Sequence, residues 1–139
     1  MLILDTDHLS ELDRGTALSE TLKRRLAATQ LPVATTIVSV EEQLRGRLAS
    51  LARARDARKL IDLYSRLQTV IVDLGNWWIS PWTDTSADVY EKLAKSRLGI
   101  GTMDLRIASI VLAANATLLS CNLKDFQRVP DLKVEDWLS

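Results

Sequence analysis

Cysteine and histidine are almost missing from this chain of 139 residues, which has one of each, Cys121 and His8. A single cysteine cannot form an intramolecular disulfide. It also excludes zinc sites built from four cysteines or from two cysteines and two histidines. A lone histidine has few partners for a catalytic triad, so we expect both residues to be structural. Catalytic chemistry must therefore come mainly from other side chains.

Long apolar runs and an excess of one charge are missing as well. The opening residues 1–4 reach Asp5 too soon for a signal peptide, and residues 107–119 are too short and too interrupted to span a bilayer. The 18 basic and 18 acidic residues cancel, which excludes a uniformly basic coat for nucleic acid. We expect a soluble cytoplasmic protein without a membrane segment, in which any polyanion binds where charge is locally segregated.

The length and the ordinary composition, 47% hydrophobic and 26% charged, predict a single globular domain, residues 1–139. Short apolar segments alternate with longer helical patterns, which predicts an α/β fold with a central, mostly parallel sheet flanked by helices. The expected strands are 2–4, 32–35, 78–82, 117–120 and a short one around Val134. The first expected helix ends at about residue 12, and the second covers 16–28. The third and fourth lie between residue 39 and about residue 71 and are separated by a charged bend at 53–56. The fifth covers 84–96 and the sixth 103–115. We expect Asp84 or Thr85 to cap the fifth of these helices and Thr102 the sixth, and Pro81 to mark a sheet edge or strand end.

Acidic side chains follow several of the expected strands. They are Asp5, Asp7, Glu41, Glu42, Asp104 and Asp125. Because ligands of open parallel sheets bind at the carboxyl ends of the strands, these carboxylates are expected to converge. Converging carboxylates repel one another unless a cation neutralises them, which favours a site for a hard metal ion. Taken singly, Glu41, Glu42 or Asp104 is better explained by the preference of helix first turns for acids.

The four acidic segments resemble, in order and spacing, the motifs of PIN-domain ribonucleases of the VapC type, the toxins of bacterial toxin–antitoxin pairs. The segments are residues 2–7 (LILDTD), 38–46 (VSVEEQLRG), 99–108 (GIGTMDLRIA) and 120–126 (SCNLKDF), and residues 129–137 resemble the closing segment. The second acid of the family lies four residues before a glycine, which selects Glu42 over Glu41 here. Asp7 stands where the family usually has asparagine, and Ser120 where threonine is commoner.

This resemblance implies a metal-dependent endoribonuclease with Mg²⁺, or Mn²⁺ in its place. Asp5, Glu42 and Asp104 correspond to the catalytic metal ligands, and Asp125 completes the site or orients the attacking water. Asp7, Ser120 and Asn122 are expected to orient these side chains. The resemblance also implies a homodimer and a VapB-type antitoxin as partner.

Phosphate binding requires positive charge, and the basic stretch at residues 45–66 provides it. We take Arg45, Arg53, Arg55 and Arg58 as candidate RNA contacts, although a solvated helical face explains such a charge run equally well. The four tryptophans are more typical of core or interface anchors than of base-stacking platforms.

Two other functions are compatible with parts of the sequence. A phosphatase of the haloacid-dehalogenase type would use Asp5 as nucleophile and Asp7 as general acid, but Asp125 has no adjacent acid and the chain leaves little room for a cap. A catalytically silent PIN-fold binding module is the second alternative. The presence of all four acids argues against it.

Overall fold

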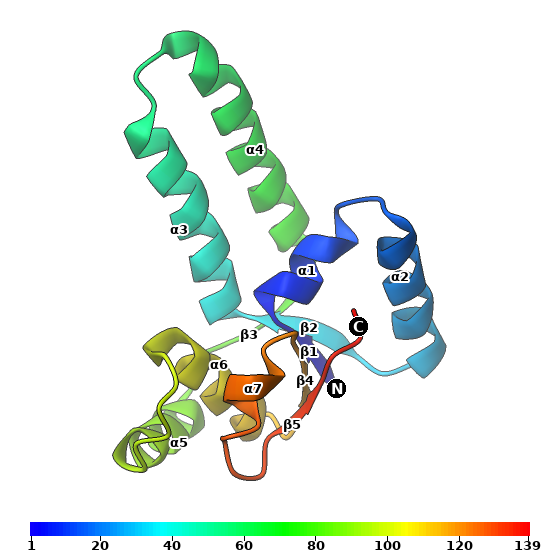
Figure 1. Ribbon diagram of the computed structural model, residues 1–139, viewed down its shortest axis with the longest axis vertical. Helices are drawn as coiled ribbons and strands as arrows, with labels where there is room; N and C mark the ends of the chain where they lie inside the picture. The colour runs from blue at the N-terminus through cyan, green and yellow to red at the C-terminus, as the bar shows by residue number, and fades with distance from the viewer.

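The computed structural model describes residues 1–139 and contains a five-stranded parallel sheet in the order β3-β2-β1-β4-β5 (Figure 1). The strands are β1 (Leu2–Leu4), β2 (Val33–Thr36), β3 (Trp78–Ser80), β4 (Thr117–Leu119) and β5 (Lys133–Glu135). The helices are α1 (Thr6–Leu12), α2 (Ala17–Thr29), α3 (Ile37–Arg53), α4 (Ala57–Gly75), α5 (Asp84–Lys95), α6 (Thr102–Ala113) and α7 (Leu123–Phe126). The predicted α/β fold is confirmed, and the sheet is parallel throughout.

Both faces of the sheet are covered, as the nearly continuous apolar strands require. Ile3, Ala34 and Leu118 point to one face and pack in the larger core, with residues of α5 and α6. Leu2, Leu4 and Leu119 point to the opposite face, where they meet Leu22 of α2 and Trp137 of the C-terminal segment. The side chains alternate because successive residues of a strand face opposite sides.

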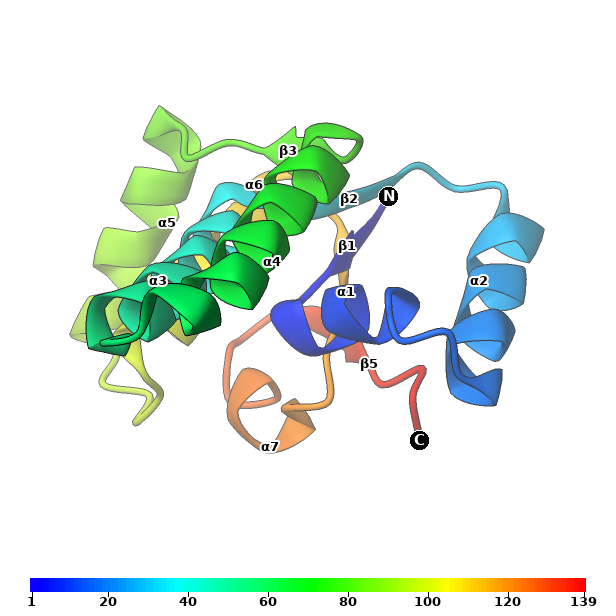
Figure 2. The ribbon, with the colours of Figure 1, turned by 90° about the horizontal axis from the view of Figure 1, so that it is seen from above.

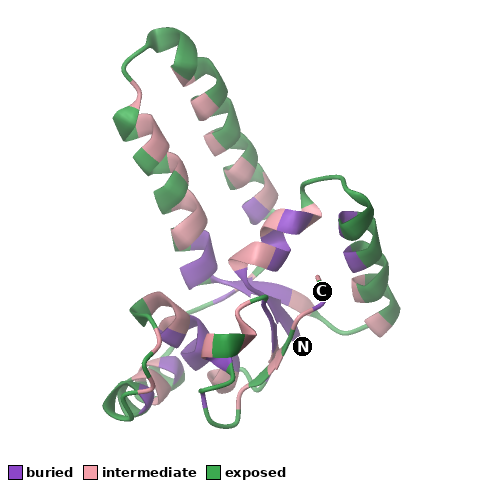
Figure 3. Cartoon of the chain, in the orientation of Figure 1, coloured by how far each residue is buried: buried purple, intermediate pink, exposed green.

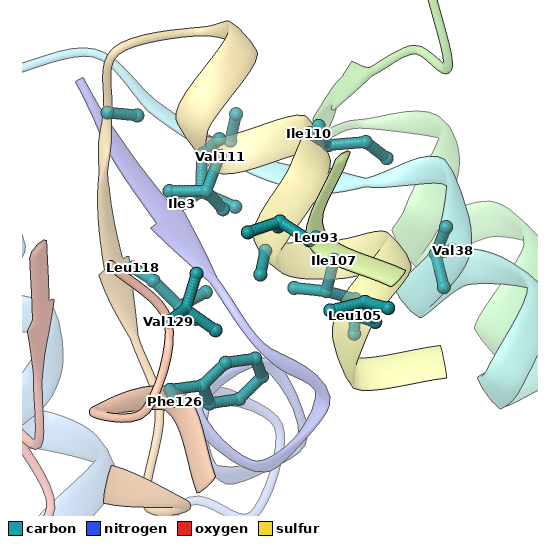
Figure 4. Packing of buried hydrophobic residues seen from close by; sticks show 13 residues of the cluster. Ile3, Val38, Leu93, Leu105, Ile107, Ile110, Val111, Leu118, Phe126 and Val129 are labelled. Atoms are coloured by element: carbon teal, nitrogen blue, oxygen red, sulfur yellow. The ribbon is translucent and has the colours of Figure 1, made fainter. Parts of the chain in front are cut away.

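Helix α6 is the most deeply buried of the long helices, and it holds Asp104 beside the carboxyl ends of the strands. Ile107 and Val111 are fully buried against Ile3 and Leu118, and Phe126 of α7 closes the same cluster (Figure 4). This packing anchors the rest of α6, so that its first turn, which contains Asp104, has a fixed position beside the ends of β1 and β4.

Helices α3 and α4 form a hairpin that projects from the sheet (Figures 1 and 2). Its base is buried through contacts among Leu9 of α1, Val40 of α3 and Leu74 of α4. Exposure increases toward the tip, the loop 54–56, where both helices are solvent-exposed on most sides (Figure 3). The charged bend expected at residues 53–56 is confirmed.

Several predicted boundaries are wrong by a few residues. Thr83, rather than Asp84 or Thr85, caps α5, because its side chain accepts the N–H of Ser86 in a reciprocal capping box. Gly101 rather than Thr102 precedes α6, and no side chain caps that helix. Strand β3 ends at Ser80, and it lies at the edge of the sheet as Pro81 indicated. None of the helices combines the length and the apolar character needed to cross a bilayer.

Candidate active site

Asp5 directly follows β1 and is the N-cap of α1. Its Oδ1 accepts the Thr6 N–H at 2.8 Å and its Oδ2 accepts the Ser120 hydroxyl at 2.9 Å. Only 7% of the residue is exposed. Burial, followed by the negative charges of Asp7 and Asp104, raises the pKa of Asp5 from 3.8 to about 6. The side chain is therefore firmly positioned but electrostatically strained.

Glu42 approaches Asp5 from the second turn of α3, so first-turn capping, the alternative explanation for this acid, does not apply. Burial raises the pKa of its carboxyl group above the ordinary value, and the charges of Asp5 and Asp104 add to this. Its Oε1 is buried without a hydrogen-bond partner. Glu41, by contrast, is exposed and pairs with Arg45. The structure thus places Glu42, and not Glu41, against the other acids.

Asp104 and Asp125 are joined by one amide side chain. Nδ2 of Asn122 donates to Asp104 Oδ2 at 3.1 Å and to Asp125 Oδ2 at 3.2 Å. Burial and the neighbouring Asp125 nevertheless raise the pKa of Asp104 above its ordinary value. The backbone N–H of Asn122 donates to Ser120 Oγ at 3.0 Å, which connects the residue that holds Asp104 and Asp125 to the serine that donates to Asp5. The predicted orienting residues Ser120 and Asn122 thus both contact the acids.

Asp7 lies at the rim of this cluster beside His8 and Cys121. Although burial raises its pKa, hydrogen bonds from the His8 ring and the Cys121 N–H lower it, and the net pKa is below the ordinary value. Burial, with the charges of Asp7 and Asp136, raises the pKa of the Cys121 thiol to about 12, so the thiolate is not available at neutral pH. His8, expected to be a structural residue near the site, contacts it directly through the hydrogen bond between its ring and Asp7.

The candidate RNA contacts do not join the acidic cluster. Arg53, Arg55 and Arg58 lie exposed at the tip of the hairpin. Arg53 is eleven residues beyond Glu42 on α3, which is about 16 Å along the helix axis. Arg45 is closer to the site but is paired with Glu41. Any role of these arginines therefore requires a ligand long enough to reach both the site and the tip.

The donor set fits a divalent cation with oxygen ligands. Burial raises the pKa of each of Asp5, Glu42 and Asp104, and in each case the charges of neighbouring acids raise it further. The buried Glu42 Oε1 makes no hydrogen bond of good geometry. A cation among these side chains would remove the repulsion and satisfy that oxygen. Carboxylate oxygens suit Mg²⁺ and Mn²⁺ better than softer metals.

Comparisons with known proteins bear on the family and the fold of the chain. No family model matches the chain. However, the chain is 32% identical over 112 residues to Ribonuclease VapC2 of Rickettsia felis, an alignment that covers 81% of the chain and 79% of the relative. The chain belongs to the VapC ribonuclease family. It is also 47% identical over 45 residues to Ribonuclease VapC1 of Haemophilus influenzae, covering 32% of the chain and 34% of that protein.

Solved VapC structures share the fold along nearly the whole chain. The VapBC2 complex of Rickettsia felis bound to a promoter DNA fragment matches with a TM-score of 0.74 at 22% identity, covering 98% of both chains. DNA-bound VapBC from Salmonella typhimurium matches with a TM-score of 0.77 at 18% identity, covering 98% and 97%. The VapC family and its fold, inferred from the four motifs, are thereby confirmed for this chain.

The raised pKa values make a prediction about stability without metal. The difference between about 6 and 3.8 for Asp5 corresponds to about 3 kcal/mol of destabilisation that is fully present above pH 6 and is relieved as the pH falls toward 4. Asp104→Asn removes one of the repelling charges. We expect the metal-free variant to melt at a higher temperature than the wild type at neutral pH, with the difference shrinking as the pH falls.

Thermal melts in chelator between about pH 4 and pH 7.5 measure this effect. A variant less stable than the wild type by a constant amount at every pH would mean that the carboxylates do not interact.

Proposed function

We propose that this VapC-family chain, as a single domain of residues 1–139, is a metal-dependent endoribonuclease that acts as the toxin of a toxin–antitoxin pair. The supporting observation is the convergence of Asp5, Glu42 and Asp104, whose pKa values are all raised, first by burial and then by the charges of acids around them. Membership of the VapC ribonuclease family supports the choice of RNA as substrate.

Asp5, Glu42 and Asp104 would hold Mg²⁺, or Mn²⁺ in its place. The bound cation supplies positive charge to the scissile phosphate and makes a water molecule more acidic. Asp125 is half-buried and held by Asn122 at 3.2 Å, which suits it to orient the attacking water and accept a proton from it. Ser120 and Asn122 fix the rotamers of the acids they contact.

The phosphatase alternative is disfavoured by the hydrogen bonds of its two key residues. Both oxygens of Asp5 already accept hydrogen bonds, which reduces its nucleophilicity. A general acid needs a raised pKa, whereas the pKa of Asp7 is lowered. The silent binding module is disfavoured because all four acids are present and three of them contact one of the expected orienting side chains.

The proposed ligands make the first functional prediction. Asp5→Asn and Asp104→Asn are each expected to lower Mg²⁺-dependent RNA cleavage on the order of 10²–10³-fold, because each removes a charged oxygen at the reacting centre. Glu41→Gln is the matched control, since Glu41 is adjacent to Glu42 but exposed, and it is expected to cleave RNA normally.

Melting temperatures give an independent measure of the same site. Mg²⁺ at a hundredfold excess over its dissociation constant is expected to stabilise the wild type by about 2.7 kcal/mol and Asp104→Asn much less. Normal turnover by both ligand variants would remove Asp5 and Asp104 from the site.

The hairpin tip is the second element of the proposal. Arg53, Arg55 and Arg58 concentrate positive charge on a protein whose net charge is zero, so they are the candidate contacts for the RNA backbone. Replacing all three by Gln is expected to reduce the salt dependence of RNA binding by about two units of slope, at roughly 0.7 per lost phosphate contact on a single strand.

The matched control replaces Lys92, Lys95 and Arg97, three exposed cations at the end of α5, by Gln. Both variants lose the same net charge. Equal changes in slope would show that the tip contributes only general electrostatic attraction.

A groove along α3 is the proposed contact of a VapB-type antitoxin. It has a volume of about 1080 Å³ and is lined mainly by apolar side chains, among them Ile37, Leu44 and Leu48 of α3 and the aromatic Trp82 and Tyr90. Trp82 and Tyr90 pack edge to face with ring centroids 5.8 Å apart, which gives the groove a firm wall. Such a surface suits the apolar face of a partner segment. The homodimer implied by the family resemblance stays a prediction.

Leu48 tests this contact because it lines the groove and is 55% exposed. Leu48→Asp is expected to weaken binding of the antitoxin encoded beside this gene at least tenfold, since a carboxylate would be buried in an apolar interface, while RNA cleavage is unchanged. The control is Leu31→Asp, at a residue 48% exposed in the loop between α2 and β2. Equal affinity of both variants for the antitoxin would place its contact elsewhere.

A further inference from the structure

A fully buried histidine lies one residue beyond Asp7. The His8 ring accepts the backbone N–H of Trp137 on Nε2 at 3.0 Å, and its Nδ1 lies 2.8 Å from Asp7 Oδ1. Because Nε2 is used as an acceptor, the ring proton is on Nδ1 and is donated to Asp7. Asp136 Oδ1 is 3.8 Å from Nε2, too far for a hydrogen bond. The C-terminal segment thus determines which ring nitrogen faces Asp7.

Asp7 receives donors on both carboxylate oxygens. Besides the ring of His8, its Oδ1 accepts the His8 backbone N–H at 2.6 Å, and its Oδ2 accepts the Cys121 N–H at 2.9 Å. The Ser120 hydroxyl is 3.4 Å from Asp7 Oδ2 but only 2.9 Å from Asp5 Oδ2. A hydroxyl has a single proton to donate, so Ser120 donates mainly to Asp5. The main contact of Asp7 with the site is therefore the backbone of the loop at residues 120–122.

That loop carries the side chains that orient the proposed metal ligands. Ser120 donates to Asp5, and Asn122 donates to Asp104 and Asp125. The Asn122 N–H also donates to Ser120 Oγ, which holds the two side chains in a fixed relation. A shift of this loop would move three of the four acids together.

We propose that Asp7 and His8 are positioning residues that hold the loop 120–122, and through it Asp5, Asp104 and Asp125, and that Asp7 is not itself a metal ligand. The inference rests on the proposed metal-dependent function. It also explains the carboxylate at a position where the family usually has asparagine. His8 is fixed as a donor by Trp137, and Cys121 contributes an N–H, so residue 7 must accept on both oxygens, which an amide cannot do.

The same geometry argues against a separate metal site at this position. Asp7, His8 and Cys121 offer ligand atoms within 4.8 Å of one another. However, the nitrogen that faces this cluster is Nδ1, which carries the proton and has no free lone pair for a metal. Hydrogen bonds, rather than an ion, satisfy the Asp7 carboxylate.

Mn²⁺ binding to the purified full-length protein, followed by electron paramagnetic resonance, tests the proposal without relying on activity. His8→Leu is expected to weaken Mn²⁺ binding by about tenfold or more, although its side chain is buried and cannot reach the ion, because loss of an orienting contact typically costs 10–100-fold in metal affinity. Asp7→Asn is expected to have an effect of similar size. The double variant should bind Mn²⁺ no more weakly than the weaker single variant, because either change breaks the same chain of hydrogen bonds.

Asp131→Asn is the matched control. It removes the same charge from an exposed carboxylate in the C-terminal segment that makes no contact with the loop 120–122 or with His8, so Mn²⁺ affinity should be that of the wild type. Wild-type affinity in His8→Leu, or additive losses in the double variant, would overturn the proposal. If Asp104→Asn binds Mn²⁺ as the wild type does, the metal site itself is wrong and the inference fails with it.

Nitrogen-15 NMR of the wild type gives a second test that does not depend on whether the variants fold. The chain has one histidine, so its ring signals need no further assignment. We expect the Nδ1–H tautomer, unchanged when Mg²⁺ or Zn²⁺ is added. An Nε2–H tautomer, or a shift of the ring nitrogens with Zn²⁺, would overturn the proposed chain of contacts.

Discussion

Repulsion among partly buried carboxylates is the constraint on which the rest of the site depends. Asp5 is buried and Glu42 and Asp104 are half-buried, and none of the ion pairs of the molecule includes any of them. The protein supplies only hydrogen bonds from Thr6, Ser120 and Asn122, which hold geometry but leave the charge unbalanced. The missing positive charge must come from outside the chain. This makes the site selective for a cation, whether a metal ion or a basic side chain of a partner.

The sheet and its helices hold these charges together against their repulsion. The larger core buries Ile3, Ile107 and Leu118 completely and so connects β1, α6 and β4 rigidly. Asp5 directly follows β1 and Asp104 lies in the first turn of α6, while Glu42 belongs to α3, which Val38 anchors in the same core. The three acids therefore cannot separate without disrupting packed side chains. On the opposite face, Leu22 and Trp137 pack against β1, and Trp137 also donates to His8. Core packing and the orientation of the acids are therefore coupled through the same segments.

The sequence was sufficient for the features that depend on local periodicity and was insufficient for those that depend on tertiary contacts. The strands and the convergence of Asp5, Glu42 and Asp104 were predictable, because apolar segments followed by acids have only one edge of a parallel sheet at which to meet. The N-cap positions Thr83 and Gly101 were missed by one or two residues, since several neighbouring residues are plausible caps. The role of His8 was not predictable. It depends on a backbone N–H 129 residues further along the chain.

Although the net charge is zero, the acidic and basic residues are separated in space, which the composition could not reveal. The acids gather at the sheet edge, whereas Arg53, Arg55 and Arg58 gather at the hairpin tip, about 16 Å from Glu42 along α3. At physiological ionic strength the Debye length is about 8 Å, so across solvent the acidic cluster scarcely weakens the attraction of the tip for a polyanion. A neutral protein can thereby keep a local positive potential for the RNA backbone beside a site that favours cations. The projecting hairpin provides the distance that makes both possible.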